Sequence, residues 1–89
     1  MNLDELRTQL DTIDNQMIRL LSQRAELILQ VADVKKQNGL PVHVPEREDA
    51  ILARLRRRNP GPLDGEAIER IYRLILEEMR HFEDEHVVH

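Results

Sequence analysis

The 89-residue sequence predicts an all-α fold of three helices, with a long first helix, a short second one and a third of medium length. Apolar residues recur every three or four positions over most of the chain, and prolines and glycines interrupt this pattern in two places. No stretch shows the strict alternation that is typical of β-strands. We therefore expect one helical domain over residues 1–89, in which residues 84–89 form a flexible tail or linker.

The first helix is expected from Leu3 to about Lys36. Asn2 can cap its start, because an asparagine side chain accepts a hydrogen bond from an amide that has no partner within the helix. Asn38-Gly39 suits a left-handed C-cap, and Pro41 cannot continue a helix. Together these signals delimit a single helix that occupies more than a third of the chain.

The first helix carries a heptad seam that one charge, Arg24, interrupts. A guanidinium buried in an apolar interface is costly unless an anion pairs with it, so either the chain supplies a carboxylate there or an acidic ligand does. A helix of this length spans roughly 50 Å, so its seam stays exposed unless a second chain covers it. We therefore expect an intertwined homodimer. The other seam positions are apolar: Leu3, Leu6, Leu10, Ile13, Met17, Leu20, Leu27, Val31 and Val34.

The second helix is expected from about Glu46 to Arg58, after a short extended link. Val44 is held in an extended conformation by the proline that follows it, and Pro45 suits the first turn of a helix. His43, in the link, is expected to be exposed. The basic run 56–58 is expected to be a solvated helix end.

The third helix is expected to follow the helix-breaking run 59–62, Asn-Pro-Gly-Pro, and to end near Glu83. Asp64 can cap its start. The aromatic residues Tyr72 and Phe82 are expected in the core. One row at helical spacing carries Glu83 toward the interior with three other residues. The row is Tyr72, Leu76, Met79 and Glu83.

Composition argues against several classes of function. A net charge of −4 argues against a general nucleic-acid binder, and the absence of cysteine excludes disulfides, thiol nucleophiles and thiolate metal sites. His81, His86 and His89 form no closed ligand set, so we expect no metal. We find neither a signal region nor a stretch apolar enough to span a bilayer, and we expect a cytoplasmic location without membrane contact.

Two cations project from the same side of the first helix. Arg24 and Lys35 are eleven residues apart, which at 100° per residue returns to within about 20°. Lying three turns apart, they can grip one ligand from its two ends. Arg7 faces elsewhere, and it reaches the surroundings of Arg24 only from the partner subunit of an antiparallel or crossed dimer.

The second helix adds a further cation and a carboxylate beside its apolar stripe, Arg47 and Glu48. Taken singly, such charges are usually solvated and contribute little to stability or function. Taken together, the cations aimed at one cavity exceed what Glu48 and Glu83 can neutralise. The surplus fits a small dicarboxylate ligand.

Five segments carry a resemblance to a known family: Leu6-Arg7, the run 20–27, Val34-Lys35, Pro41-Val42 and the run 45–48. At matching spacing, and across nearly the whole chain, these segments resemble the all-helical class of chorismate mutase. The resemblance implies a domain-swapped homodimer with two equivalent sites. Each site would convert chorismate to prephenate without a metal or a cofactor.

The resemblance also implies a role for each charged residue. Arg24 and Arg7 of the partner subunit would bind the two carboxylates of chorismate, and Arg47 would help to hold the bound conformer. Lys35 would donate to the ether oxygen of the breaking bond, and Glu48 would accept from the ring hydroxyl. A unimolecular rearrangement needs no nucleophile, so catalysis would come from holding a reactive conformer and stabilising charge on that oxygen.

Three positions depart from the family pattern. Val44 and Met79 stand where many members have an acidic residue and a small hydroxyl residue, so those polar contacts are absent or replaced. Glu83 stands where a second donor to the ether oxygen, often glutamine, is expected. Because a carboxyl group donates a hydrogen bond only when it is protonated, we expect turnover to fall as pH rises.

Other functions remain open at this point. An isochorismate pyruvate lyase of the same architecture would use nearly the same cations, because the two substrates are close isomers. The chain could also be an effector-binding regulatory domain, associated with or fused to 3-deoxy-7-phosphoheptulonate synthase, the first enzyme of the shikimate pathway. For a purely structural dimer, Arg24→Leu should raise stability and change nothing else.

Overall fold

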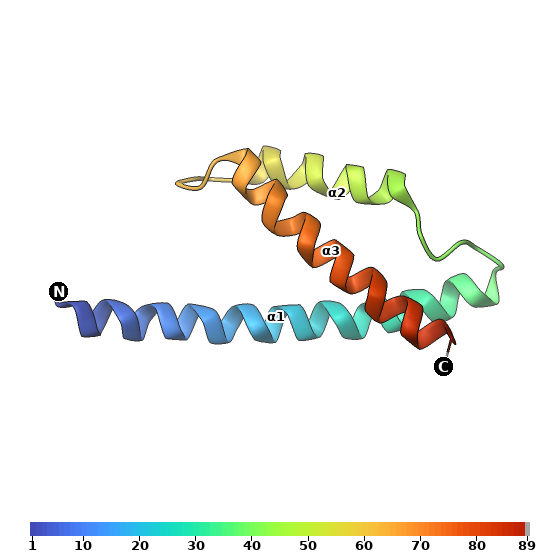
Figure 1. Ribbon diagram of the computed structural model, residues 1–89, viewed down its shortest axis with the longest axis horizontal. Coiled ribbons are helices and arrows are strands. Elements are labelled where there is room, and N and C mark those ends of the chain that lie inside the picture. Colours follow the sequence, from blue (N-terminus) through green and yellow to red (C-terminus); the bar gives the residue numbers. More distant parts are fainter. Residues whose placement is uncertain (89) are drawn as a thin grey trace.

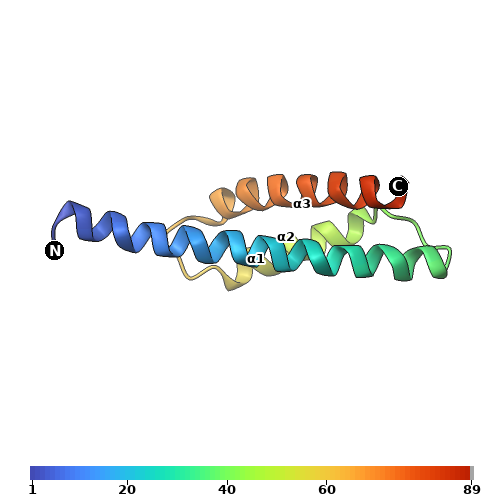
Figure 2. The same cartoon turned by 90° about the horizontal axis from the view of Figure 1, so that it is seen from below.

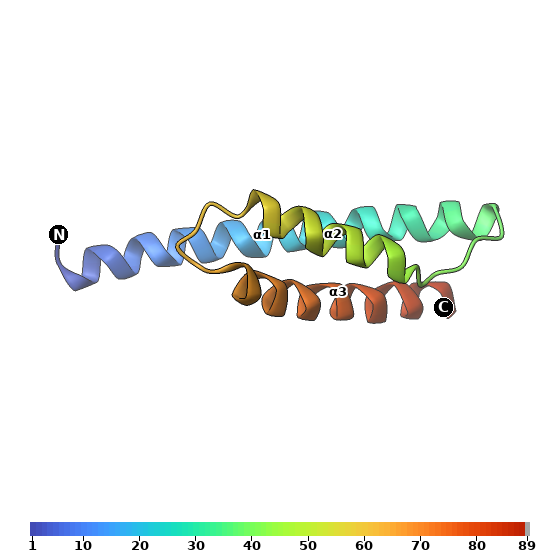
Figure 3. The same ribbon diagram turned by 90° about the horizontal axis from the view of Figure 1, so that it is seen from above.

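The computed structural model describes residues 1–88 and is all-α, which confirms the predicted fold class. Its helices are α1 (Leu3–Gln37), α2 (Pro45–Arg58) and α3 (Gly65–Val88). In Figure 1, α1 is a long rod, the end of α3 crosses its C-terminal half, and α2 lies above α1, beside the start of α3. The molecule measures 55 × 27 × 15 Å. The views from below and above show that the first turns of α1 project beyond both other helices (Figures 2 and 3).

Helix α1 begins and ends close to where its capping residues predict. The Oδ1 atom of Asn2 accepts a hydrogen bond from the Glu5 amide over 2.8 Å. At the other end, Gly39 adopts a φ of 64°, and the Leu40 amide donates to the Lys35 carbonyl over 2.8 Å. This is a Schellman motif, which satisfies carbonyls that the last turn leaves free.

The first turns of α2 and α3 also follow the predicted signals. Helix α2 begins at Pro45, and the preceding Val44 has an extended φ of −126°. At the start of α3, the Asp64 Oδ1 atom accepts from the Ala67 amide over 2.7 Å. Both starts lie within one residue of the predicted positions, because proline and aspartate act locally on the backbone.

Helix α3 is longer than predicted. It continues through Val88, whereas the sequence placed its end near Glu83. The His86 Nε2 atom lies 3.0 Å from Asp33 Oδ1 on α1, and this tertiary contact supports the added turn. Residues 84–88 are therefore helical, while His89 lies outside the described residues. The predicted boundary was wrong because the sequence pattern does not show which residue of α1 faces this turn.

The buried core lies where α3 packs on its neighbours. In residues 1–88, α3 packs on both α1 and α2, but α1 and α2 do not pack on each other. Ile51 and Leu52 of α2 form a buried cluster with Leu76 of α3, and Leu55 and Tyr72 pack against this cluster. The prediction that Tyr72 belongs to the core is confirmed.

Much apolar surface remains exposed on the single chain. Phe82, predicted to be a core residue, is 39% exposed, because it lies about 240° around α3 from the buried Leu76. Every residue from 1 to 20 is exposed. No helix within residues 1–88 has both the length and the apolarity to cross a membrane. The exposed seam residues of α1 are Leu3, Leu6, Leu10, Ile13, Met17, Leu20, Leu27, Val31 and Val34.

Candidate functional site

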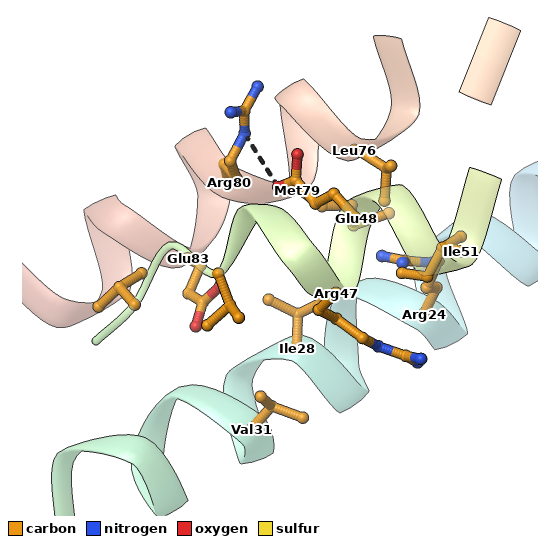
Figure 4. Close-up of a pocket in the computed structure, with 12 residues that line it drawn as sticks. Arg24, Ile28, Val31, Arg47, Glu48, Ile51, Leu76, Met79, Arg80 and Glu83 are labelled. Carbon is orange, nitrogen blue, oxygen red and sulfur yellow. Dashed lines mark ion pairs between the residues drawn. The ribbon is translucent and has the colours of Figure 1, made fainter. Parts of the chain in front are cut away.

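A cavity of about 160 Å³ is enclosed by all three helices and the link between α1 and α2. Apolar side chains and five charged ones form its wall. Figure 4 shows Glu83 on one side of the cavity, with Arg24 and Arg47 on the other. The lining residues are Arg24, Ile28 and Val31 of α1, Val42 and Val44 of the link, Arg47, Glu48 and Ile51 of α2, and Leu76, Met79, Arg80 and Glu83 of α3.

Arg24 brings a guanidinium group without a partner into this cavity. Its NH1 atom is buried and forms no hydrogen bond with any described residue. None of the carboxylates in residues 1–88 forms an ion pair with it. The sequence left two possible partners for Arg24, a carboxylate of the chain or an acidic ligand. The described residues supply no such carboxylate. The guanidinium is therefore free to bind an acidic ligand.

Lys35 and Glu83 form a partly buried ion pair at the opposite side. The Lys35 Nζ atom donates to Glu83 Oε2 over 3.0 Å and to the Val42 carbonyl over 2.6 Å. Glu83 is only 4% exposed, which confirms that its helical row carries it inward. A buried carboxylate is costly unless a cation or hydrogen-bond donors satisfy it, and Lys35 fulfils that requirement here. Lys35 itself does not line the cavity, although both of its partners do.

Glu48 forms an ion pair with Arg80 and lies near His43, two residues that lie outside the predicted site. Its Oε2 atom lies 3.4 Å from Arg80 Nε and 3.7 Å from His43 Nε2. The Arg80 NH1 atom lies 3.3 Å from the same His43 nitrogen. Sequence reasoning missed Arg80, although its position four residues after Leu76 places it beside the buried row of α3.

Of the remaining predicted positions, two line the cavity and one lies far from it. Val44 and Met79 both line the cavity, so apolar groups occupy the places where polar ones are common in the resembling family. Arg7 is exposed on the projecting part of α1, roughly 25 Å along the helix from Arg24, and does not line the cavity of its own chain. Within residues 1–88, no group of three or more His, Cys, Asp or Glu side chains is placed to hold a metal ion.

Comparison with known proteins adds independent evidence. The model of the family "chorismate mutase type II" matches residues 6–84. The chain is 41% identical over 78 residues to the bifunctional chorismate mutase/prephenate dehydratase of Aquifex aeolicus, an alignment that covers 83% of this chain and 22% of that protein. The chain thus spans about a fifth of the length of the first curated relatives that it matches.

Solved structures show the same arrangement of helices. Form II of the chorismate mutase from Thermus thermophilus matches with a TM-score of 0.90 and 32% identity, over 92% of this chain and 93% of that one. The chorismate mutase from Helicobacter pylori, solved in complex with prephenate, matches with a TM-score of 0.88 and 33% identity, over 96% and 92%. With a family match over residues 6–84 and the shared three-helix fold, the chain belongs to the chorismate mutase type II family.

Proposed function

We propose that the protein is an isomerase that rearranges chorismate to prephenate, in the biosynthesis of aromatic amino acids. The observation that carries this proposal is the buried NH1 atom of Arg24, which has no hydrogen-bond partner among the described residues and lies in a cavity that Arg47 also lines. The two carboxylates that line the cavity, Glu48 and Glu83, already have other cationic partners. The site therefore has cationic capacity left for a small dicarboxylate, and the related Helicobacter pylori enzyme is in complex with prephenate.

The roles of these residues in the proposal are those that the resemblance to chorismate mutase implies. Arg24 binds one carboxylate of the substrate, and Arg47 helps to hold the reactive conformer in place. Glu48 accepts a hydrogen bond from the ring hydroxyl. Lys35 turns its ammonium group toward the ether oxygen, where negative charge develops as the bond breaks. No nucleophile takes part, because bonds form and break within one molecule.

Glu83 has a different task from the glutamine that is expected at its position. In the ligand-free protein its carboxylate accepts a hydrogen bond from Lys35 over 3.0 Å. To donate to the ether oxygen, the group must take up a proton, since only a carboxylic acid carries a donor hydrogen. Lys35 and a protonated Glu83 then form a pair of donors. This requirement for a proton makes turnover fall as pH rises.

A homodimer completes the site in this proposal. The exposed seam of α1 is apolar along its length, and an antiparallel copy can cover it. The same pairing brings Arg7 of a partner subunit to the cavity, where it binds the second carboxylate. A mixed-dimer experiment tests this composite site. Arg7→Ala and Arg24→Ala homodimers should each be nearly inactive, but after subunits exchange at random, roughly a quarter of the sites regain both arginines.

The direct test of the reaction uses purified protein with two substrates. We expect chorismate to be consumed and prephenate to form, while isochorismate yields no salicylate and pyruvate. Loss of isochorismate with release of pyruvate would identify a lyase instead. Binding of prephenate without turnover of either substrate would favour a regulatory domain. An Arg24→Ala variant serves as the control, because its cavity lacks the guanidinium that binds a substrate carboxylate in this proposal.

Association with a larger enzyme stays part of the proposal. The sequence predicted a link to 3-deoxy-7-phosphoheptulonate synthase, whereas the Aquifex aeolicus relative is bifunctional with prephenate dehydratase. Mixing the chain with purified 3-deoxy-7-phosphoheptulonate synthase and measuring the mass of the species formed tests that link. A mass equal to the separate components would refute it. The expected cytoplasmic location is tested by fractionating cells that express the protein.

A further inference from the structure

The charges that line the cavity are paired selectively. Two carboxylates, Glu48 and Glu83, face a space that also receives Arg24 and Arg47. Neither carboxylate forms an ion pair with these two arginines in the described chain. Glu83 is paired with Lys35, and Glu48 with Arg80. Opposite charges that share a cavity attract each other strongly, so this separation needs a physical cause.

We propose that Arg80 is a positioning residue that holds Glu48 away from Arg24 and so keeps the guanidinium of Arg24 free for the substrate. This inference rests on the proposed function, which it deepens by naming what prevents the empty site from neutralising itself. Arg80 acts through Glu48 and need not touch the substrate.

The geometry supports this role from α3. Arg80 directly follows Met79, a buried residue in the wall, and its Nε atom lies 3.4 Å from Glu48 Oε2. Figure 4 shows the guanidinium of Arg80 directed away from the cavity, with the ion pair to Glu48 drawn back toward α2. Arg80 lines the cavity, while its ion pair holds the carboxylate of Glu48 on the side away from Arg24.

His43 supports the same arrangement from the link. An arginine carries no acceptor, so the Arg80 NH1 atom donates and the His43 Nε2 atom, 3.3 Å away, accepts. His43 thereby restrains the second end of the Arg80 guanidinium. The link, α2 and α3 each contribute one residue to this network, and Glu48 is the only one of the three with a substrate contact in the proposed mechanism.

Without Arg80, Glu48 loses its nearest cation. The side chain of glutamate has three rotatable bonds, so a freed carboxylate can turn toward either arginine. Arg47 is exposed to water, whereas the NH1 atom of Arg24 is buried without a hydrogen-bond partner, so the attraction to Arg24 is screened less. An internal pair between Glu48 and Arg24 would then compete with the carboxylate of the substrate. The expected consequence is a loss of affinity, which appears in KM more than in kcat.

The kinetic test compares Arg80→Gln with Arg73→Gln. Arg73 is a matched control, because it also lies on α3 and also pairs with a glutamate, Glu69, over 3.0 Å, but it does not line the cavity. We expect Arg80→Gln to raise KM for chorismate about tenfold, because an internal pair between Glu48 and Arg24 would compete with the substrate, and to change kcat less. Arg80→Lys should recover most of the loss, and Arg73→Gln should resemble the wild type.

A double-mutant cycle shows whether Arg80 acts through Glu48. In a Glu48→Gln background, the neutral amide cannot form the competing ion pair, so adding Arg80→Gln should raise KM no further. Independent penalties that multiply in the double variant would overturn the inference. So would an Arg80→Gln variant that has the same KM as Arg73→Gln. Matching thermal unfolding curves confirm that the variants are folded.

A structural readout separates this inference from the proposed function. In a crystal structure of ligand-free Arg80→Gln, we expect a Glu48 carboxylate oxygen within hydrogen-bonding distance of the Arg24 guanidinium. A Glu48 side chain that keeps its present position would refute the role of Arg80, whatever the enzyme turns over. Conversely, a wild-type protein that leaves chorismate unchanged would refute the proposed function while this comparison still decides the inference.

Discussion

The two halves of α1 carry the same heptad pattern but have different surroundings. In the first half, residues 1–20 are all exposed, including every apolar seam position. In the second half, Ala32 is buried, and Arg24 and Ile28 line a cavity against α3 and the link. Identical periodicity therefore does not mean identical packing. The second half meets its own chain through Ile28 and Ala32, whereas no residue of the first half is buried. The apolar seam stays exposed in both halves.

A charged residue in the seam can either stabilise the fold through an ion pair or bind a ligand. Arg24 lies at the boundary between the halves, in a position where a leucine would extend the stripe. Its buried NH1 atom has no partner among residues 1–88, so the charge does not contribute to holding the chain together. A residue that weakens the seam and lines a cavity is better explained by ligand binding than by stability.

Replacing Arg24 should have the largest effect on catalysis, and a replacement in the first half of α1 should have none. We expect Arg24→Leu to lower kcat/KM about a thousandfold, which corresponds to about 4 kcal/mol of transition-state stabilisation. Stability should rise by about 1 kcal/mol, because an unpaired charge leaves an apolar seam. Steady-state kinetics and urea unfolding measure both quantities. Arg19→Leu, at an exposed position of the other half, is the control and should leave turnover unchanged. Equal activity of the two variants would contradict the assignment.

A charged substitution in the first half of α1 tests whether a second copy of the chain covers its apolar seam. In an isolated chain, Ile13→Glu should be nearly neutral, because Ile13 is 50% exposed. In a dimer paired along the seam, the same change should cost about 2–3 kcal/mol, since it removes apolar contact and buries a carboxylate. Sedimentation at several protein concentrations would then show dissociation. Asn15→Glu, which lies off the seam, is the matched control, and identical sedimentation of both variants would argue against seam pairing.

The second half of α1 also holds Lys35, whose partner on α3, Glu83, should make turnover depend on pH. We expect the kcat/KM of the wild type to fall with rising pH, because Glu83 donates a hydrogen bond only in its protonated form. Glu83→Gln carries a permanent donor, so at alkaline pH it should exceed the wild type by about tenfold, the contribution of one such hydrogen bond. Rate measurements across pH with chorismate decide the point. Parallel profiles for the two proteins would show that Glu83 is not the controlling donor.

The smallest effect is expected at the far end of the second half, where His86 contacts Asp33 over 3.0 Å. This exposed pair should contribute at most about 0.5 kcal/mol, so His86→Ala should leave global unfolding nearly unchanged. Amide hydrogen exchange should nevertheless increase in the last turn of α3, because the turn loses its tertiary contact. Unchanged exchange in that turn would show that α3 is stable there without α1.

Local signals in the sequence were sufficient for most of the fold. Asn2, Gly39 and Asp64 act on the nearest turn of backbone, and the structure places a helix terminus at each. The end of α3 was missed because its support, Asp33, is more than fifty residues away in the sequence. Phe82 was misplaced for a related reason, since helical spacing identifies faces but not which face meets the rest of the chain.

The candidate site was predictable to the extent that it depends on positions within one helix. Spacing alone placed Arg24 and Lys35 on one side of α1 and turned Glu83 inward on α3. The partners of these groups were not predictable, because the hydrogen bonds from Lys35 to the Val42 carbonyl and from Arg80 toward His43 join different elements. Sequence periodicity contains no information about the distance between two helices.

The absence of direct packing between α1 and α2 within residues 1–88 has a mechanical consequence. Arg24 belongs to one of these helices and Arg47 to the other, so the gap between the two guanidinium groups is set by how α3 tilts across both. A bulkier side chain where α3 packs on α1 or α2 can therefore widen or narrow the gap between the two guanidinium groups. Under the proposed function, affinity for a dianion should be adjustable from positions that line no part of the cavity.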